Sequence, residues 1–267
     1  MKLIKAIVAL SLLVSAPASF AALSSSYQFN GQGNWSIDAA GDITGWSRLR
    51  ATVPTGSTVE QAFLYSSTYF NTPRPVLEFG GEVIAGASRW TALGTTGGPV
   101  NGLQAFRADV TAQVASVVAA GGEFLFNVVE MAGGIDGQIL AVVYSNPDEV
   151  ERQINLFDGY ADTFGDETAL TLDDPLTGEL LGDADFEASL SLGIGFSSQP
   201  ELLFPQESEI DINGVRVSSA AGGQDDGQRE NDGLITAGDT YDDDFSSNPE
   251  NPFAGAQTTR SDDEAYN

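Results

Sequence analysis

The stretch from residue 103 to residue 160 places the strongest limit on what this chain can fold into. It contains three short apolar segments, 123–130 (EFLFNVVE), 138–144 (QILAVVY) and 153–160 (QINLFDGY), which are rich in β-branched and aromatic residues. Glycines and an Asn-Pro pair separate them. Short apolar runs bounded by turn residues are typical of strands covered on both faces, as in the core of a β-sandwich.

A single short helix is predicted just before these strands. The spacing i, i+4, i+7, i+8 of one helix face is occupied by Val110, Val114, Val117 and Val118. Asp109 or Thr111 can cap the first turn, and Gly121-Gly122 would end the helix. We interpret Asp109 and Thr111 as caps rather than as ligands.

The flanking sequence predicts further strands and turns. Strand character appears at 42–54, 58–70, 75–84, 187–197 and 209–218. Gly80-Gly81 and Asn213-Gly214 predict the turns of two β-hairpins, because type I′ turns favour these dipeptides. We expect an edge strand plus loop over 22–41, a loop over 85–101, and loop or disorder over 220–267.

The first 21 residues have the pattern of a secretory signal peptide. Lys2 and Lys5 form a basic start, residues 7–14 an apolar core, and Ser19-Phe20-Ala21 a small-x-small cleavage site. The apolar core is too short for a permanent membrane span. We therefore expect the mature chain to begin near Ala22 and to act outside the cytoplasm, on the outer surface of a Gram-negative bacterium or beyond it.

The missing residue types exclude most catalytic chemistries. The sequence has no Cys and no His, and its only Lys residues are Lys2 and Lys5. Such a mature chain can form no Ser-His-Asp triad, no His- or Cys-ligated zinc site and no lysine Schiff base. A carboxylate-pair glycoside hydrolase is the enzyme class left open, with no pair nominated. We expect a non-catalytic protein.

The charge is large, negative and unevenly distributed. Without the signal peptide, nine Arg stand against 38 acidic residues, a net charge of −29. Residues 22–140 carry −4 and residues 141–267 carry −25. Such a charge disfavours nucleic acid and attracts divalent cations. The shift predicts a first β-sandwich domain over 22–160 and an acidic β-rich region with a loop-rich end over 161–267.

A weak internal echo suggests how these two regions are related. Segments 76–86 (VLEFGGEVIAG) and 210–223 (IDINGVRVSSAAGG) both predict a hairpin followed by a loop of small residues. The echo predicts two related sandwich halves, the second incomplete because the sequence is a fragment.

Calcium is the cofactor that this composition favours. Asp158, Asp162 and Asp166 recur every four residues in DGYADTFGDE, and Ca²⁺ prefers six to eight oxygen ligands. The segment does not match an EF-hand loop. The alternative is a solvated acidic surface of a salt-adapted secreted protein.

Aromatic side chains offer a second kind of candidate site. Tyr65, Tyr69 and Trp90 lie on or near predicted sheet faces, where exposed rings could stack on sugars. Within 58–70, Phe63, Tyr65, Ser67 and Tyr69 share one face of the strand. The alternative for these aromatics is core packing. The sequence leaves a carbohydrate-binding module open as a function.

Three segments also carry a resemblance. The runs GWSRLRATVPTGSTVEQAFLYSS, AFRADVTAQV and DGQILAVVYSNP with INLFDGYAD are similar to an uncharacterised group of secreted bacterial β-sandwich proteins. Many of those proteins end in a PEP-CTERM tail read by an exosortase, in bacteria that produce exopolysaccharide. No such tail occurs in this sequence, which agrees with a truncated chain. The DVT turn also resembles that of galactose-binding-like jelly rolls.

These observations combine into one expectation. We expect an all-β antiparallel sandwich or jelly-roll-like protein with one short helix, serving as a non-catalytic cell-surface or extracellular-matrix component stabilised by calcium. The resemblance implies exopolysaccharide or other surface proteins as partners.

Overall fold

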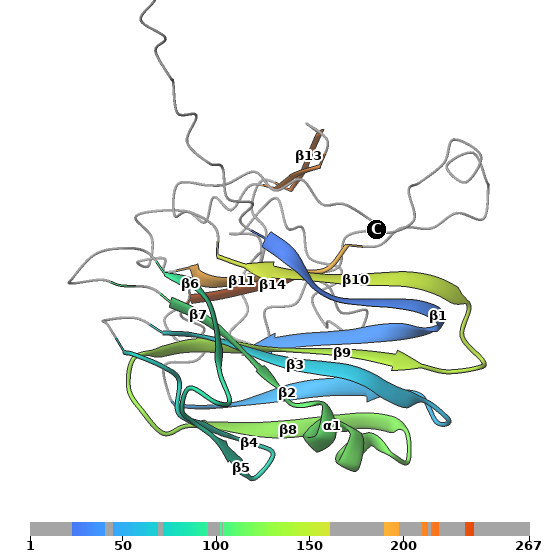
Figure 1. The fold of residues 1–267 in the computed structure, drawn as a ribbon, viewed down its shortest axis with the longest axis horizontal. Coiled ribbons are helices and arrows are strands. Elements are labelled where there is room, and N and C mark those ends of the chain that lie inside the picture. Colours follow the sequence, from blue (N-terminus) through green and yellow to red (C-terminus); the bar gives the residue numbers. More distant parts are fainter. Residues whose placement is uncertain are drawn as a thin grey trace, which may run out of the picture.

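The computed structural model describes residues 23–40, 45–68, 72–95, 102, 104–160, 190–197, 210–212, 215–218 and 233–237. These residues form two antiparallel sheets, two further strand pairs and one short helix (Figure 1). The two sheets face each other across a shared apolar core. The expected all-β, sandwich-like fold with one short helix is therefore confirmed.

The larger sheet has six strands and is completely antiparallel. In spatial order its strands are β10 (Glu151–Gly159), β1 (Leu23–Ala40), β9 (Ile135–Ser145), β3 (Thr58–Thr68), β7 (Gln104–Asp109) and β6 (Thr91–Thr95). In β9, successive side chains from Ile139 to Tyr144 are all buried, so this strand is covered on both faces as expected. The loop expected over 85–101 contains β6.

The smaller sheet lies on one side of the larger sheet. Its strands, in spatial order, are β2 (Trp46–Val53), β8 (Gly122–Glu130), β4 (Leu77–Phe79) and β5 (Glu82–Ile84). The predicted hairpin at Gly80-Gly81 is confirmed, with φ of 57° and 90° at the two glycines, as a type I′ turn requires.

The prediction that β8 is covered on both faces is wrong. Phe126 and Val128 point into the core, whereas Leu125 and Val129 are 53% and 40% exposed. An apolar run favours a strand, but it does not say whether another layer packs on the second face. In β8 that second face points away from the core.

The core between the two sheets is built from large apolar side chains. Phe79 and Phe126 stack with their ring centroids 4.9 Å apart. Helix α1 (Thr111–Val118) contacts β3 and β8 and buries Val114 and Val118. The helix has Val110 as its N-cap residue and no side-chain capping hydrogen bond, so the capping roles predicted for Asp109 and Thr111 are wrong. The Thr111 amide instead donates a 2.9 Å hydrogen bond to the Asp109 carboxylate at the end of β7.

Strand β1 differs from the edge strand plus loop expected over 22–41. It spans 18 residues, pairing with β10 in its first half and with β9 in its second half. The halves meet near Gly33, where a Cβ atom would lie 2.3 Å from the Tyr144 carbonyl oxygen. The first half of β1 and β10 form a ribbon that lies above β9 and β3 in Figure 1. We call it the β1–β10 ribbon.

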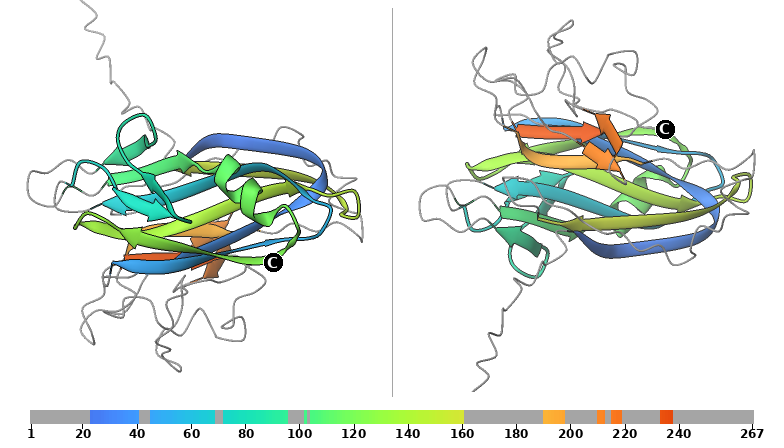
Figure 2. Two further views of the ribbon diagram at one scale, coloured as in Figure 1. Left: turned by 90° about the horizontal axis from the view of Figure 1, so that it is seen from below. Right: turned by 90° about the horizontal axis from the view of Figure 1, so that it is seen from above.

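The remaining strands form two short pairs. β11 (Leu192–Ser197) pairs with β14 (Gly233–Ala237), and both contact β9 (Figure 2). β12 (Ile210–Ile212) pairs with β13 (Val215–Ser218), as expected for 209–218, although the Asn213-Gly214 turn lies outside the described residues. The loop expected over 220–267 contains β14.

Several sequence predictions fall outside the described residues. Residues 1–21 and most of 161–267 are among them, so the signal peptide, the domain boundary at residue 160 and the two-halves hypothesis stay predictions. In the part of the chain that the structure describes, no helix has the length and apolar character to cross a membrane.

Candidate functional site

The best-defined polar cluster lies between the β1–β10 ribbon and the larger sheet. Asp158 on β10 is 8% exposed. One of its carboxylate oxygens, Oδ2, lies 2.5 Å from Nη1 of Arg107 on β7 and accepts a 3.1 Å hydrogen bond from the Tyr65 hydroxyl on β3. We call these three residues the Asp158 cluster. They meet because the ribbon folds over the sheet, which brings β10 across to β3 and β7.

The cluster compensates its own charge. The Arg107 guanidinium lies 4.5 Å from the centroid of the Phe63 ring, and Phe63 packs edge-to-face on Tyr65. Burial raises the pKa of Tyr65, and the Asp158 carboxylate raises it further. The phenol therefore stays protonated and acts as a hydrogen-bond donor. The buried carboxylate of Asp158 is therefore matched by one cation and one neutral hydrogen-bond donor.

The predicted calcium ligands are placed only in part. Asp158 is engaged with Arg107, and Asp162 and Asp166 lie outside the described residues. Among the residues whose placement is known, no three acidic, His or Cys side chains gather as a metal site would require. The three-aspartate calcium site stays a prediction. Asp158 could bind Ca²⁺ there only by giving up its ion pair with Arg107.

The predicted glycan contacts are also placed in part. Trp90 is 3% exposed, and its indole meets Phe106 edge-on with the ring centroids 6.4 Å apart. Tyr65 is half-buried and bonded to Asp158, and Tyr69 lies outside the described residues. Stacking on a sugar needs an exposed ring face, which the packing of Trp90 does not provide. A glycan contact at these positions stays a prediction.

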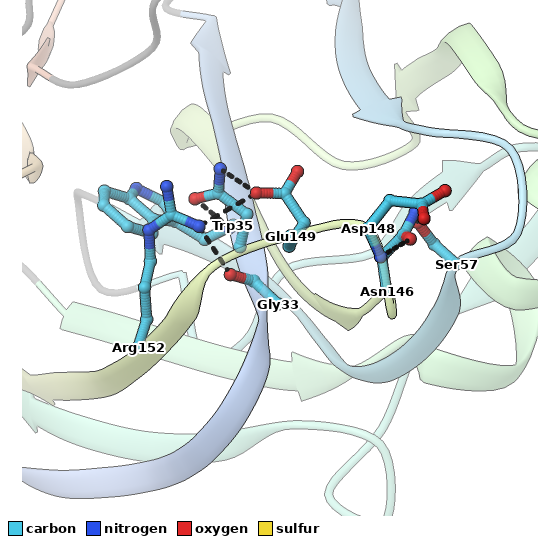
Figure 3. Close-up of polar contacts among 8 residues, drawn as sticks. Gly33, Trp35, Ser57, Asn146, Asp148, Glu149 and Arg152 are labelled. Atoms are coloured by element: carbon cyan, nitrogen blue, oxygen red, sulfur yellow. Dashed lines mark hydrogen bonds and ion pairs between the residues drawn. The ribbon is translucent and has the colours of Figure 1, made fainter.

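A second polar cluster occupies the turn between β9 and β10 (Figure 3). Asn146 is 3% exposed, and its side-chain amide donates to Ser57 Oγ at 2.9 Å and to the Thr55 carbonyl at 3.3 Å. Its side-chain oxygen accepts from the Asp148 amide. Asn146 thereby joins the β9–β10 turn to the turn between β2 and β3, which is a structural role.

The other end of the same turn holds an ion pair. Arg152 Nη1 lies 2.9 Å from the Glu149 carboxylate and donates to the Gly33 carbonyl at 2.9 Å (Figure 3). Asn34 donates to the same carboxylate at 3.5 Å. These contacts hold the bend of β1 at Gly33, where the β1–β10 ribbon leaves the sheet. Glu149 and Arg152 are thus used internally.

One open depression carries both acidic and basic groups. It has a volume of about 440 Å³ and is lined by Glu82, Arg89, Asp109, Ala112, Gln113 and Ser116. Arg89 pairs with Glu82 at 2.7 Å. Although burial alone would raise it, the pKa of Asp109 is lowered by hydrogen bonds from Thr111. A lowered pKa is the opposite of what a general acid needs.

The outward side of the smaller sheet has a different character. Trp46, Leu125 and Val129 are 45%, 53% and 40% exposed, and the Arg48 guanidinium lies 5.7 Å from the centroid of the Trp46 ring. We call the outward side chains of this sheet the outer β2–β8 face. Sequence reasoning missed it. The signal was present in β8, where apolar residues occupy both alternating faces.

The fold defines the class of this chain as an all-β, sandwich-like protein. Comparisons with family models, curated proteins and solved structures gave no match.

Proposed function

We propose that this chain is a secreted, non-catalytic component of a bacterial cell surface or extracellular matrix. The observation that carries the proposal is that the buried acidic side chain of the best-defined polar cluster forms an internal ion pair. The buried carboxylate of Asp158 is paired with Arg107, and this pair joins the β1–β10 ribbon to the larger sheet. A carboxylate-pair hydrolase would instead set two carboxylic acids against each other across a substrate groove.

Export and lack of turnover can be tested together. The full chain, expressed in a Gram-negative host, is expected outside the cytoplasm with Ala22 as its first residue, which N-terminal sequencing would report. The purified protein is expected to release no reducing ends from a panel of neutral and acidic polysaccharides. Retention in the cytoplasm would remove the secreted role, and glycan turnover would remove the non-catalytic one.

Calcium stabilisation belongs to the same proposal, because a chain with 38 acidic residues repels itself unless cations bind. Millimolar Ca²⁺ is expected to raise the melting temperature relative to a chelator. Calcium at a hundredfold over Kd adds roughly 2.7 kcal/mol to the free energy of unfolding.

The variants that test calcium binding should spare the Asp158 cluster. Asp162→Asn with Asp166→Asn removes two predicted ligands without touching the Arg107 ion pair, and is expected to abolish the calcium-dependent shift. Asp148→Asn, an exposed carboxylate in the β9–β10 turn, is the matched control and is expected to retain it. If calcium raises the melting temperature of the double variant as much as that of the wild type, calcium binds elsewhere. If calcium does not raise the melting temperature of the wild type, the proposed calcium stabilisation is wrong.

A further inference from the structure

Two polar side chains lie on the core-facing side of β1, where a sandwich ordinarily places apolar residues. The strand register sets Ser36 opposite Val142 on β9. It sets Asp38 opposite Leu140, and both β9 residues belong to the core between the sheets. Ser36 and Asp38 therefore point into the same side, and they are only 4% and 7% exposed. Burying a hydroxyl and a carboxylate is costly unless hydrogen bonds compensate them.

Both side chains bind the free edge of β2. In the smaller sheet β2 pairs with β8 on one side only, so its other side is a sheet edge. The Thr52 amide donates to the Ser36 hydroxyl oxygen at 3.1 Å. The Arg50 amide donates to the Asp38 carboxylate. Amides two residues apart in a strand point to the same side, so the two side chains accept from donors that a neighbouring strand would otherwise pair.

The contact closes one side of the sandwich without strand pairing. β1 contacts β2, but the described residues of the two strands form no backbone ladder with each other. An edge with unpaired backbone donors is a template for a strand from another molecule. Inward-pointing charged residues are one means by which proteins close such an edge. Asp38 is a residue of this kind, because it points inward from β1 and binds the edge directly.

We propose that Ser36 and Asp38 form a latch that closes the edge of β2 and prevents it from pairing with a strand of a second copy of the chain. Without the two side chains, the Arg50 and Thr52 amides lose their acceptors and β1 loses its polar ties to β2. The edge of β2 then becomes available for pairing. The latch requires neither export nor calcium, so its failure and the failure of the proposed function are separate results.

Hydrogen exchange of the purified protein tests the latch at the two amides that it binds. Ser36→Ala is expected to speed exchange of the Thr52 amide about tenfold, because that amide loses its hydrogen bond. Asp38→Ala is expected to do the same to the Arg50 amide, whereas Asp38→Asn keeps an acceptor oxygen and should retain the protection. The Ala51 amide points to β8 and serves as the reference that neither variant should change.

Ser66→Ala is the matched control for the serine of the latch. Ser66 is a buried serine on β3, 3% exposed, and its hydroxyl has no hydrogen-bond partner among the described residues. Its replacement should leave the exchange of both edge amides unchanged. The proposal is overturned if neither latch variant speeds exchange at its own amide, or if Ser66→Ala has the same effect as Ser36→Ala.

Sedimentation velocity tests whether the latch prevents association. The double variant Ser36→Ala with Asp38→Ala is expected to contain a larger fraction of dimers and higher species than the wild type. The comparison is made at about 1 M salt, where a Debye length of about 3 Å screens the repulsion between acidic copies. Circular dichroism checks the fold, and Ser36→Ala alone replaces the double variant if the latter does not fold. Faster exchange without greater association overturns the proposal, because the two side chains would then only satisfy buried donors.

Discussion

The outer faces of the two sheets come from similar sequences and end in opposite environments. β9 on the larger sheet and β8 on the smaller sheet are both short, apolar and β-branched. The outward Ile139 of β9 is 8% exposed, because the β1–β10 ribbon and the β11–β14 pair lie over that sheet. The outward Leu125 of β8 is 53% exposed. A second apolar face on a strand can therefore be either covered by a third layer or left exposed.

Charged side chains also differ between the covered face of the larger sheet and the open face of the smaller sheet. On the covered face, Arg107 and Asp158 form an ion pair whose side chains are 20% and 9% exposed. On the open face, Arg50 and Glu123 are 3.9 Å apart and both partly solvated, with side chains 32% and 54% exposed. Solvent-exposed pairs contribute little to stability, whereas breaking a buried pair strands an uncompensated charge. The two faces should therefore respond very differently to loss of an arginine.

The largest effect is expected from Arg107→Met. This change leaves the Asp158 carboxylate buried without its cation, which should lower the free energy of unfolding by about 3–5 kcal/mol. Urea denaturation followed by tryptophan fluorescence would measure it. Arg48→Met, on the open face, is the control and should change stability by less than about 0.5 kcal/mol.

A second variant separates the charge from the packing. Replacing both partners, as in Arg107→Met with Asp158→Leu, removes the stranded carboxylate and should recover much of the lost stability. Equal losses in the Arg107 and Arg48 variants would mean that the Asp158 cluster is solvated, and would contradict the covering role of the ribbon.

The next largest effect compares the two faces directly. Ile139→Ala removes a buried side chain beneath β11, where a Cβ atom on Gly193 would lie 2.5 Å from Ile139 Cδ1. The expected loss is about 2–5 kcal/mol. Leu125→Ala should lose less than about 1 kcal/mol, because the side chain is already half-solvated. Thermal and urea unfolding of both variants would decide, and similar losses would show that β11 and β14 do not cover the sheet.

Local patterns were sufficient to predict most of the strands, whereas β6 and β14 lie where loops were expected. The hairpin at Gly80-Gly81, the helix with buried Val114 and Val118, and strand β9 all follow from periodicity and turn residues. These signals act over a few residues, which is why they can be recognised in a sequence. The predicted face pattern of β3 is also found, with Leu64 in the core between the sheets and Tyr65 on the opposite face.

Long-range pairing could not be predicted in the same way. Nothing near Arg107 indicates a partner 51 residues away on β10, and nothing in β1 shows that its two halves pair with different strands. The exposed state of Leu125 likewise depends on which segments pack over which sheet. The polar clusters described above could therefore be recognised only from the tertiary structure. The predicted calcium ligands Asp158, Asp162 and Asp166, in contrast, were chosen from their spacing in the sequence alone.

A smaller effect is expected from Tyr65→Phe. This change removes the hydroxyl that donates to Asp158 but keeps the ring packed against Phe63. A hydrogen bond to a charged acceptor contributes about 1.5–3 kcal/mol. Tyr27→Phe is the matched control, because the Tyr27 hydroxyl has no hydrogen-bond partner among the described residues, and should change little. Equal effects of the two substitutions on urea denaturation would argue against a specific bond to Asp158.

The smallest effect concerns Asp109, which lies where the covered face meets solvent at the start of α1. Its pKa is lowered in the folded state from an ordinary value of 3.8, so its charged form stabilises the fold above that value. This stability is lost as pH falls through the lowered pKa. Asp109→Asn should therefore reduce stability at pH 7 by less than about 1 kcal/mol, because solvent screens the exposed group. The difference from wild type should shrink on acidification below about pH 4. The outcome that would contradict this prediction is a stability difference between wild type and variant that stays constant from neutral to acidic pH. It would mean that the charge of Asp109 contributes nothing beyond the side-chain oxygen that accepts the Thr111 hydrogen bond.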